Sequence, residues 1–105
     1  MTKLENISMI KEANIYFDGK VTSRTIFLEN GEKQTLGIMM PGEYTFDTNE
    51  AEIMDMMSGE LEIRLPGEEN FKKLNTPESF NVPANSKFDL KVYTVTDYCC
   101  SYIKA

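Results

Sequence analysis

The side chains that could do chemistry in this chain are carboxylates, hydroxyls, thiols and aromatic rings, because the sequence contains no histidine. That excludes Ser-His-Asp and Cys-His catalysis and every metal site that depends on imidazole ligands. The two cysteines, Cys99 and Cys100, are adjacent. Neighbouring strand residues point to opposite faces, so we expect one core thiol and one outward or interface thiol. A strained vicinal disulfide is the alternative.

Carboxylates gather in one stretch of the chain, at Glu43, Asp47, Glu50 and Glu52. Oxygen ligands of this kind suit hard ions such as Mn²⁺ or Mg²⁺. A metal-dependent site built from these side chains is therefore an open alternative, although we expect no bound metal.

Length and charge narrow the classes of protein further. The 105 residues are enough for one domain. Acidic residues outnumber basic ones by 17 to 11, and a chain of charge −6 without a basic stripe is a poor nucleic-acid binder. The apolar runs are too short to span a membrane, and the first residues lack the apolar core of a secretory signal. With no disulfide framework either, we expect a cytoplasmic protein.

The elements that must position these side chains are short strands. Apolar residues occupy every second place at Leu61, Ile63 and Leu65, and the same alternation recurs over 88–92, 44–46 and 98–102. The Asn30-Gly31 pair is typical of a hairpin turn. No stretch of the chain has a sustained helical period, and we expect a strand over 51–58 despite its Glu and Met content. Eight to ten short strands in one domain predict an all-β sandwich or barrel over 16–105, preceded by an N-terminal arm over 1–15.

The stretch 41–61 resembles the first cupin motif, with Glu52 at the place of the motif's glutamate. The two histidines that normally precede this glutamate are replaced by Phe46 and Thr48. In a second stretch that resembles the other cupin motif, Phe88 stands where the metal-binding histidine would be. The chain therefore looks like a cupin whose metal site has been dismantled.

A narrower resemblance covers roughly residues 16–103. Several segments, in this order, resemble the pyrimidine/purine nucleoside phosphorylase family of small bacterial cupins: 16–21, 42–46, 58–59, 79–83 and 98–103. The resemblance implies a single cupin-type antiparallel β-barrel (jelly roll), usually a homodimer. It also implies a pentosyltransferase that uses inorganic phosphate to split purine and pyrimidine nucleosides into free base and ribose 1-phosphate. No cofactor is expected, because phosphate is a co-substrate.

The cupin register then assigns roles to particular residues. Glu52 points into the barrel, where it could bind the ribose hydroxyls or stabilise positive charge at C1′; the plain alternative is a buried glutamate paired for structural reasons. Aromatic rings tolerate any base that stacks on them, although inward aromatic rings are also ordinary core residues. The expected base and ribose contacts are Tyr44, Phe46, Thr48, Phe88 and Tyr102.

Phosphate needs local positive charge. The predicted phosphate ligands are Lys33 and Arg64, and the further candidates are Arg24 and Lys87. The family pattern favours Arg at the position of Lys33. Arg64 alternates with apolar residues, so it faces away from their side of the strand. Surface cations often serve solubility alone. The remaining alternative for the whole chain is a non-catalytic cupin that binds a small sugar or nucleotide.

Overall fold

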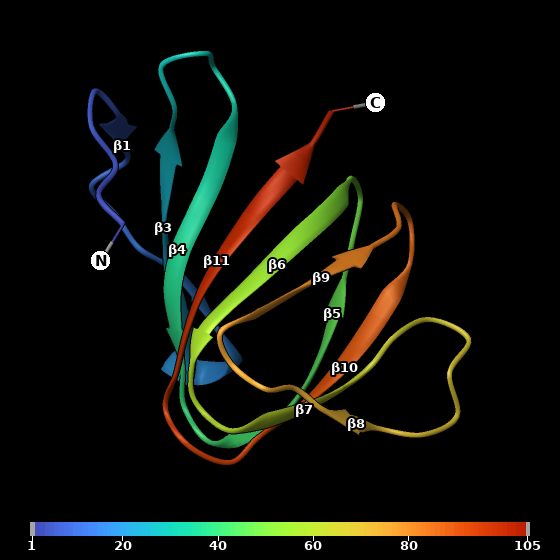
Figure 1. Cartoon of the computed structure of the whole chain (residues 1–105). Helices are drawn as coiled ribbons and strands as arrows, with labels where there is room; N and C mark the ends of the chain where they lie inside the picture. The colour runs from blue at the N-terminus through green and yellow to red at the C-terminus, as the bar shows by residue number, and fades with distance from the viewer. Residues whose placement is uncertain (1, 105) are drawn as a thin grey trace.

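The computed structural model describes residues 2–104, and most of them lie in β-strands (Figure 1). Met1 and Ala105, the outer ends of the predicted arm and barrel domain, lie outside the described residues, and the division at residue 16 stays a prediction. One 3₁₀ turn, η1 (Phe17–Gly19), accompanies the strands. The strands are β1 (Ser8–Met9), β2 (Asn14–Tyr16), β3 (Val21–Phe27), β4 (Lys33–Met39), β5 (Gly42–Asp47), β6 (Ala51–Ser58), β7 (Leu61–Arg64), β8 (Lys72–Lys73), β9 (Glu78–Val82), β10 (Lys87–Val92) and β11 (Thr96–Ile103).

The strands form two antiparallel sheets. The larger has the order β1-β3-β4-β11-β6-β9, with β2 also paired to β3, and the smaller has the order β5-β10-β7-β8. The predicted all-β antiparallel architecture is confirmed. One detail differs from a closed barrel: within residues 2–104, hydrogen bonding does not join the two sheets, so the interior is a space between two layers (Figure 1).

The expected alternation produces the core. Residues 51–58 form strand β6, as predicted, and Met54 and Met56 point inward from it. The strand ends at Ser58, and Gly59, which follows it, has a φ of +115°, a conformation that favours glycine. The Asn30-Gly31 hairpin is confirmed as well: Gly31 has φ +88°, and the turn joins β3 to β4.

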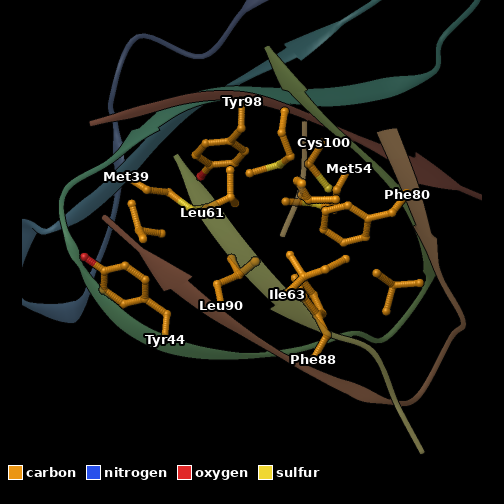
Figure 2. Packing of buried hydrophobic residues seen from close by; sticks show 14 of the residues in the cluster. Met39, Tyr44, Met54, Leu61, Ile63, Phe80, Phe88, Leu90, Tyr98 and Cys100 are labelled. Carbon is orange, nitrogen blue, oxygen red and sulfur yellow. The ribbon is translucent and has the colours of Figure 1, made fainter. Parts of the chain in front are cut away.

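Aliphatic side chains fill one part of the space between the layers. Leu61, Ile63 and Leu90 are 1%, 0% and 1% exposed. In Figure 2 they lie in the middle of the cluster, with Tyr98 on one side and Phe88 on the other. Another part of the space between the layers is lined by aromatic and polar side chains, and the candidate site lies in that part.

The N-terminal residues belong to this architecture. Strands β1 and β2 both pair with β3. The ring of Phe17 in η1 lies 4.9 Å from that of Tyr44 and 5.4 Å from that of Phe46 on β5. Phe17 therefore connects the N-terminal side of the large sheet to the edge strand of the small sheet. Among the described residues, no helix is long and apolar enough to cross a membrane.

Candidate active site

A cavity of about 130 Å³ lies between the two sheets. Tyr16 and Asp47, both exposed, lie on its open side. The predicted site residues Phe46, Glu52 and Phe88 are all in its walls, together with Tyr102. The complete lining is Tyr16, Ser23, Thr35, Met39, Phe46, Asp47, Glu52, Met54, Phe88, Tyr98, Cys100 and Tyr102.

The small sheet supplies an aromatic wall. Phe46 of β5 and Phe88 of β10 are direct partners across the antiparallel pair. Their rings stack with centroids 5.7 Å apart and an interplanar angle of 24°. Phe46 and Phe88 occupy two of the three positions at which the cupin pattern that the sequence resembles carries histidines; the third is Thr48. Phe88 is 1% exposed, so Phe46, which is only partly buried, is the ring of this pair that can offer a surface to a planar base.

The large sheet supplies a wall of hydroxyl groups. Tyr98 hydrogen-bonds to Ser23, and the Asn14 amide donates to the Ser23 hydroxyl at 3.2 Å. Burial raises the pKa of Tyr98 to about 12, so this phenol stays neutral and can donate hydrogen bonds at physiological pH. Gly37 on β4 leaves room for its ring, because a Cβ there would lie 2.9 Å from Tyr98 Cε1.

Thr35 and Tyr102 continue the hydroxyl wall towards β6. Their hydroxyl oxygens are 3.4 Å apart, and burial raises the pKa of Tyr102. Both groups therefore offer neutral donors and acceptors, which suit the hydroxyls of a sugar.

Glu52 is the ionisable group at the centre of this arrangement. It projects from β6 and is half-buried, and that burial raises the pKa of its carboxyl group. A hydrogen bond with the Cys100 thiol lowers this pKa. The negative charge of Glu50 raises it further, and the positive charge of Lys33 lowers it. No Lys or Arg of residues 2–104 forms an ion pair with Glu52. A partly desolvated carboxylate without a paired cation is suited to binding hydroxyls or stabilising developing positive charge.

The two cysteines point to opposite faces, as predicted, and both are free thiols. Cys100 faces the cavity, and burial raises the pKa of its thiol. Cys99 lies on the outer face of the large sheet, where Leu36 and Met57 line the same groove as the N-terminal Leu4. Cys99 is only 9% exposed, so the outer-face thiol is buried rather than open to solvent.

Two predicted contact residues lie outside the cavity walls. Tyr44 is buried behind Phe46, and its hydroxyl donates to the Met40 carbonyl at 2.6 Å. Thr48 is 4% exposed, and its hydroxyl donates to the Pro83 carbonyl at 2.7 Å. Tyr44 therefore fixes the β4–β5 turn, and Thr48 ties the loop after β5 to the loop before β10.

The predicted phosphate ligands are separated in space. Lys33 Nζ lies 4.4 Å from the centroid of the Tyr102 ring, beside the cavity. Arg64 lies on the outer face of the small sheet, where its Nε and Nη2 donate to Asp89 Oδ2 at 3.0 and 2.8 Å. Only Lys33 of these two is placed near Glu52.

The further cationic candidates are engaged elsewhere. Arg24 donates through Nε to the Lys11 carbonyl oxygen at 3.3 Å. Lys87 lies 3.8 Å from Asp47 in an exposed ion pair.

The carboxylates of the metal-dependent alternative do not gather. Glu43 lies on the outer face of the small sheet, beside Arg64, whereas Asp47 and Glu52 line the cavity. In the part of the chain that the structure describes, no group of three Cys, Asp or Glu side chains is arranged to hold a metal ion. The geometry gives that alternative no ligand set.

Several residues that line the cavity were not among the predicted contacts. Tyr98 and Cys100 alternate with Tyr102 on β11, and this pattern indicates that all three point to the same face. The pattern indicates less for Ser23 and Thr35, which are polar residues at inward strand positions, 4% exposed in each case. Nothing in the pattern assigns these hydroxyls to a cavity rather than to a hydrogen-bonded core.

Two facing antiparallel sheets with a cavity between them define a jelly roll of the cupin type. The solved structure of an RmlC-like cupin from Shewanella frigidimarina NCIMB 400 is similar, with a TM-score of 0.71 at 17% identity over 100% of this chain and 96% of its own. That likeness shows the fold, and the predicted fold class is confirmed.

The narrower comparisons give the family. The family model described as pyrimidine/purine nucleoside phosphorylase matches residues 11–102. A protein of that name from Sulfurimonas denitrificans is 73% identical over 104 residues, which are 99% of this chain and 100% of the relative. A crystal structure of a protein of unknown function from Acinetobacter sp. ADP1 has a TM-score of 0.92 at 33% identity, covering 96% of this chain and 98% of its own. The chain belongs to the pyrimidine/purine nucleoside phosphorylase family.

Proposed function

We propose that this protein is a nucleoside phosphorylase of broad specificity. It uses inorganic phosphate to split purine and pyrimidine nucleosides into a free base and ribose 1-phosphate. One observation carries the proposal beyond the family name: Glu52 shares one cavity with a stacked pair of rings and a wall of neutral hydroxyls. These are groups that a base, a ribose and a developing positive charge require.

The nucleoside binds with its base against Phe46 and Phe88. Stacking depends on the π-face that every base has, so this wall supports broad specificity. The cavity is smaller than the roughly 300–1,000 Å³ of typical ligand pockets, so part of the nucleoside lies on the open side, near Tyr16. The sugar binds beside Ser23 and Tyr98, which line the cavity.

Glu52 acts on the sugar in the transition state. As the C1′–N bond lengthens, positive charge develops on the ribose, as in glycoside cleavage. A carboxylate held beside C1′ stabilises that charge, and its partial burial strengthens the interaction.

Phosphate enters beside Lys33 and attacks C1′. An oxygen of phosphate forms the new bond to C1′ while the electron pair of the C1′–N bond passes to the base, which then gains a proton. The chemistry needs positioning and electrostatics, and we propose that it proceeds without a metal or organic cofactor.

We also propose that the protein is a homodimer. Ile38, Ile53 and Ile103 point away from the cavity on the outer face of the large sheet and are 39%, 38% and 42% exposed. Ile53 and Ile103 line one hollow on this face, and Ile38 lies further along it. Exposed apolar side chains on one face are typical of a surface that another chain covers. Sedimentation equilibrium tests this proposal, with twice the monomer mass expected and the monomer mass contradicting it.

The experiment that tests the reaction incubates the purified protein with uridine and, separately, adenosine. Free base is followed by chromatography and ribose 1-phosphate by ³¹P NMR, with and without phosphate. Equal amounts of base and ribose 1-phosphate, formed only when phosphate is present, are expected. The absence of base from every nucleoside tested contradicts the proposal. Thermal stabilisation by a nucleoside without any product would support the non-catalytic binding alternative instead.

A further inference from the structure

The walls of the cavity carry negative charge without a matching positive charge. Asp47 and Glu52 line it, and no Lys or Arg of the described residues does. Asp47 is balanced by Lys87, whose Nζ lies 3.8 Å away in an exposed pair. Glu52 has no such partner within residues 2–104. A ligand that brought a positive charge would supply the missing partner.

The aromatic rings of the lining favour the same kind of ligand. Five of the lining residues have aromatic rings, and the face of such a ring attracts cations within about 6 Å. One case is already present in the fold, where Lys33 Nζ lies 4.4 Å from the centroid of the Tyr102 ring. Phe46 and Phe88 lie side by side as a stacked pair and hold no cation of the described chain.

The other groups around Glu52 do not cancel its charge inside the cavity. Cys100 and Tyr102 face it from β11, and burial keeps both neutral by raising their pKa values. Glu50 and Lys33 act on it with opposite signs, and neither lines the cavity. The unmatched carboxylate therefore remains within a largely aromatic wall.

We propose that the cavity preferentially binds nucleosides whose base is itself a cation, in particular N-ribosyl pyridinium ions. The enclosed part of the cavity matches one six-membered ring, and larger bases extend to its open side. The cavity measures about 130 Å³, and an apolar cavity of about 150 Å³ accommodates one benzene ring. A pyridinium ring stacked on Phe46, with its charge facing Glu52, meets both requirements.

The proposal rests on the proposed function for its reaction, though not for its binding preference. A phosphate oxygen forms a bond to C1′ of the riboside, and the C1′–N bond breaks. The electron pair of that bond remains on the ring nitrogen and turns the pyridinium into a neutral pyridine. The base leaves without needing a proton, so the site needs no general acid for this substrate class.

A cationic base also helps to bring phosphate into an acidic site. Lys33 is the cation placed near Glu52, and the phosphate dianion would otherwise approach two carboxylates. The charge of the pyridinium attracts phosphate towards C1′ and partly offsets that repulsion.

The test compares the binding of two ligands that differ in charge and hardly in shape. Nicotinamide riboside is the cation, and its reduced dihydropyridine form is the neutral partner. Isothermal titration calorimetry of each with the full-length protein, without phosphate, gives both dissociation constants. We expect the cation to bind at least about tenfold more tightly. Equal affinities, or tighter binding of the neutral form, would overturn the proposal.

Two variants assign the preference to the cavity. Glu52→Gln keeps the shape of the side chain and removes its charge. Most of the roughly tenfold difference in affinity between the cation and the neutral ligand should therefore be lost in this variant. Glu50→Gln removes a neighbouring exposed charge and should leave the preference intact. A preference that survives in Glu52→Gln and disappears in Glu50→Gln would contradict the assignment. The wild-type comparison stands by itself if either variant fails to fold.

Kinetics separates this proposal from the proposed function. The phosphorolysis of nicotinamide riboside is compared with that of uridine, with nicotinamide and uracil as the measured products. Turnover of uridine without any charge preference in binding would overturn the present inference and leave the phosphorylase proposal standing. A strong preference for the cation with no turnover of any nucleoside would overturn the phosphorylase proposal alone.

Discussion

The Cys100 side chain and the carboxylate of Glu52 line the same cavity from neighbouring strands of the large sheet. Cys100 is two residues away from Tyr102, the direct cross-strand partner of Glu52, so the two side chains are diagonal neighbours on one face of the sheet. This diagonal places a thiol and a partly buried carboxyl group side by side on the wall of the cavity.

The first prediction concerns the charge of Glu52. Glu52→Gln should lower kcat for uridine phosphorolysis by roughly 100-fold, because it removes an electrostatic contact that strengthens in the transition state. The stability of the variant, checked by thermal melting, should show that the fold is intact. Glu50→Gln is the matched control, since Glu50 is exposed and close in sequence, and its kcat should equal that of the wild type. Equal losses in both variants would show that Glu52 has no special role.

A second prediction follows from the raised pKa of Glu52. The folded chain holds the proton of this carboxyl group more tightly than the unfolded chain, whose value is near 4.5. Ionising Glu52 therefore costs stability as pH rises from about 4.5 through the higher folded pKa. Glu52→Gln cannot ionise and avoids this cost.

Differential scanning calorimetry of wild type and Glu52→Gln from pH 4 to pH 7.5 checks the sign of this linkage. The Tm of the variant minus that of the wild type should increase as pH rises. A difference that stays constant would mean that folding does not change the pKa of Glu52, and one that decreases with pH would mean that the folded chain stabilises the carboxylate; either result contradicts the prediction.

The third prediction separates the two expected phosphate ligands. Lys33→Met should raise KM for phosphate by roughly tenfold, because it removes a charged contact to an anion. Lys33→Arg should retain phosphate binding, since it keeps the charge. Arg64→Met should change KM for phosphate by less than about twofold, because Arg64 is committed to Asp89 on the outer face. The reverse pattern would place the phosphate site outside the cavity.

The fourth prediction concerns Thr48, whose hydroxyl links two loops. Thr48→Val removes its donation to the Pro83 carbonyl and the acceptor for the Ser86 amide, 3.1 Å away. It should lower the free energy of unfolding by roughly 2 kcal/mol, measured by urea denaturation. Ser79→Ala, which removes an exposed hydroxyl bonded to Asp55, should cost less than about 0.5 kcal/mol. An unchanged unfolding free energy in Thr48→Val would contradict this structural role.

The fold was largely predictable from the sequence because the strands alternate so regularly. Leu61, Ile63 and Leu90 are buried where a period of two places them. The separation into two sheets was not predictable in the same way. Alternation shows which face of a strand is buried, whereas the joining of edge strands depends on interactions between residues far apart in the sequence.

The candidate site was predictable only in part. Phe46, Glu52 and Phe88 line the cavity because motif spacing and strand alternation agree there. Tyr44 also points inward, but its hydroxyl reaches the Met40 carbonyl, and no local pattern predicts that partner. Arg64 was a candidate through its charge alone, and its ion pair depends on a strand that follows much later in the chain.

The central claim is that the nucleoside binds between Glu52 and the stacked rings of Phe46 and Phe88. The most direct measurement is a crystal structure of Glu52→Gln, the variant expected to be slow, soaked with uridine and phosphate. We expect the base against the Phe46 ring, the ribose beside residue 52, and phosphate on the side of Lys33. A nucleoside bound elsewhere on the protein, with the cavity filled by side chains or solvent, would contradict the account.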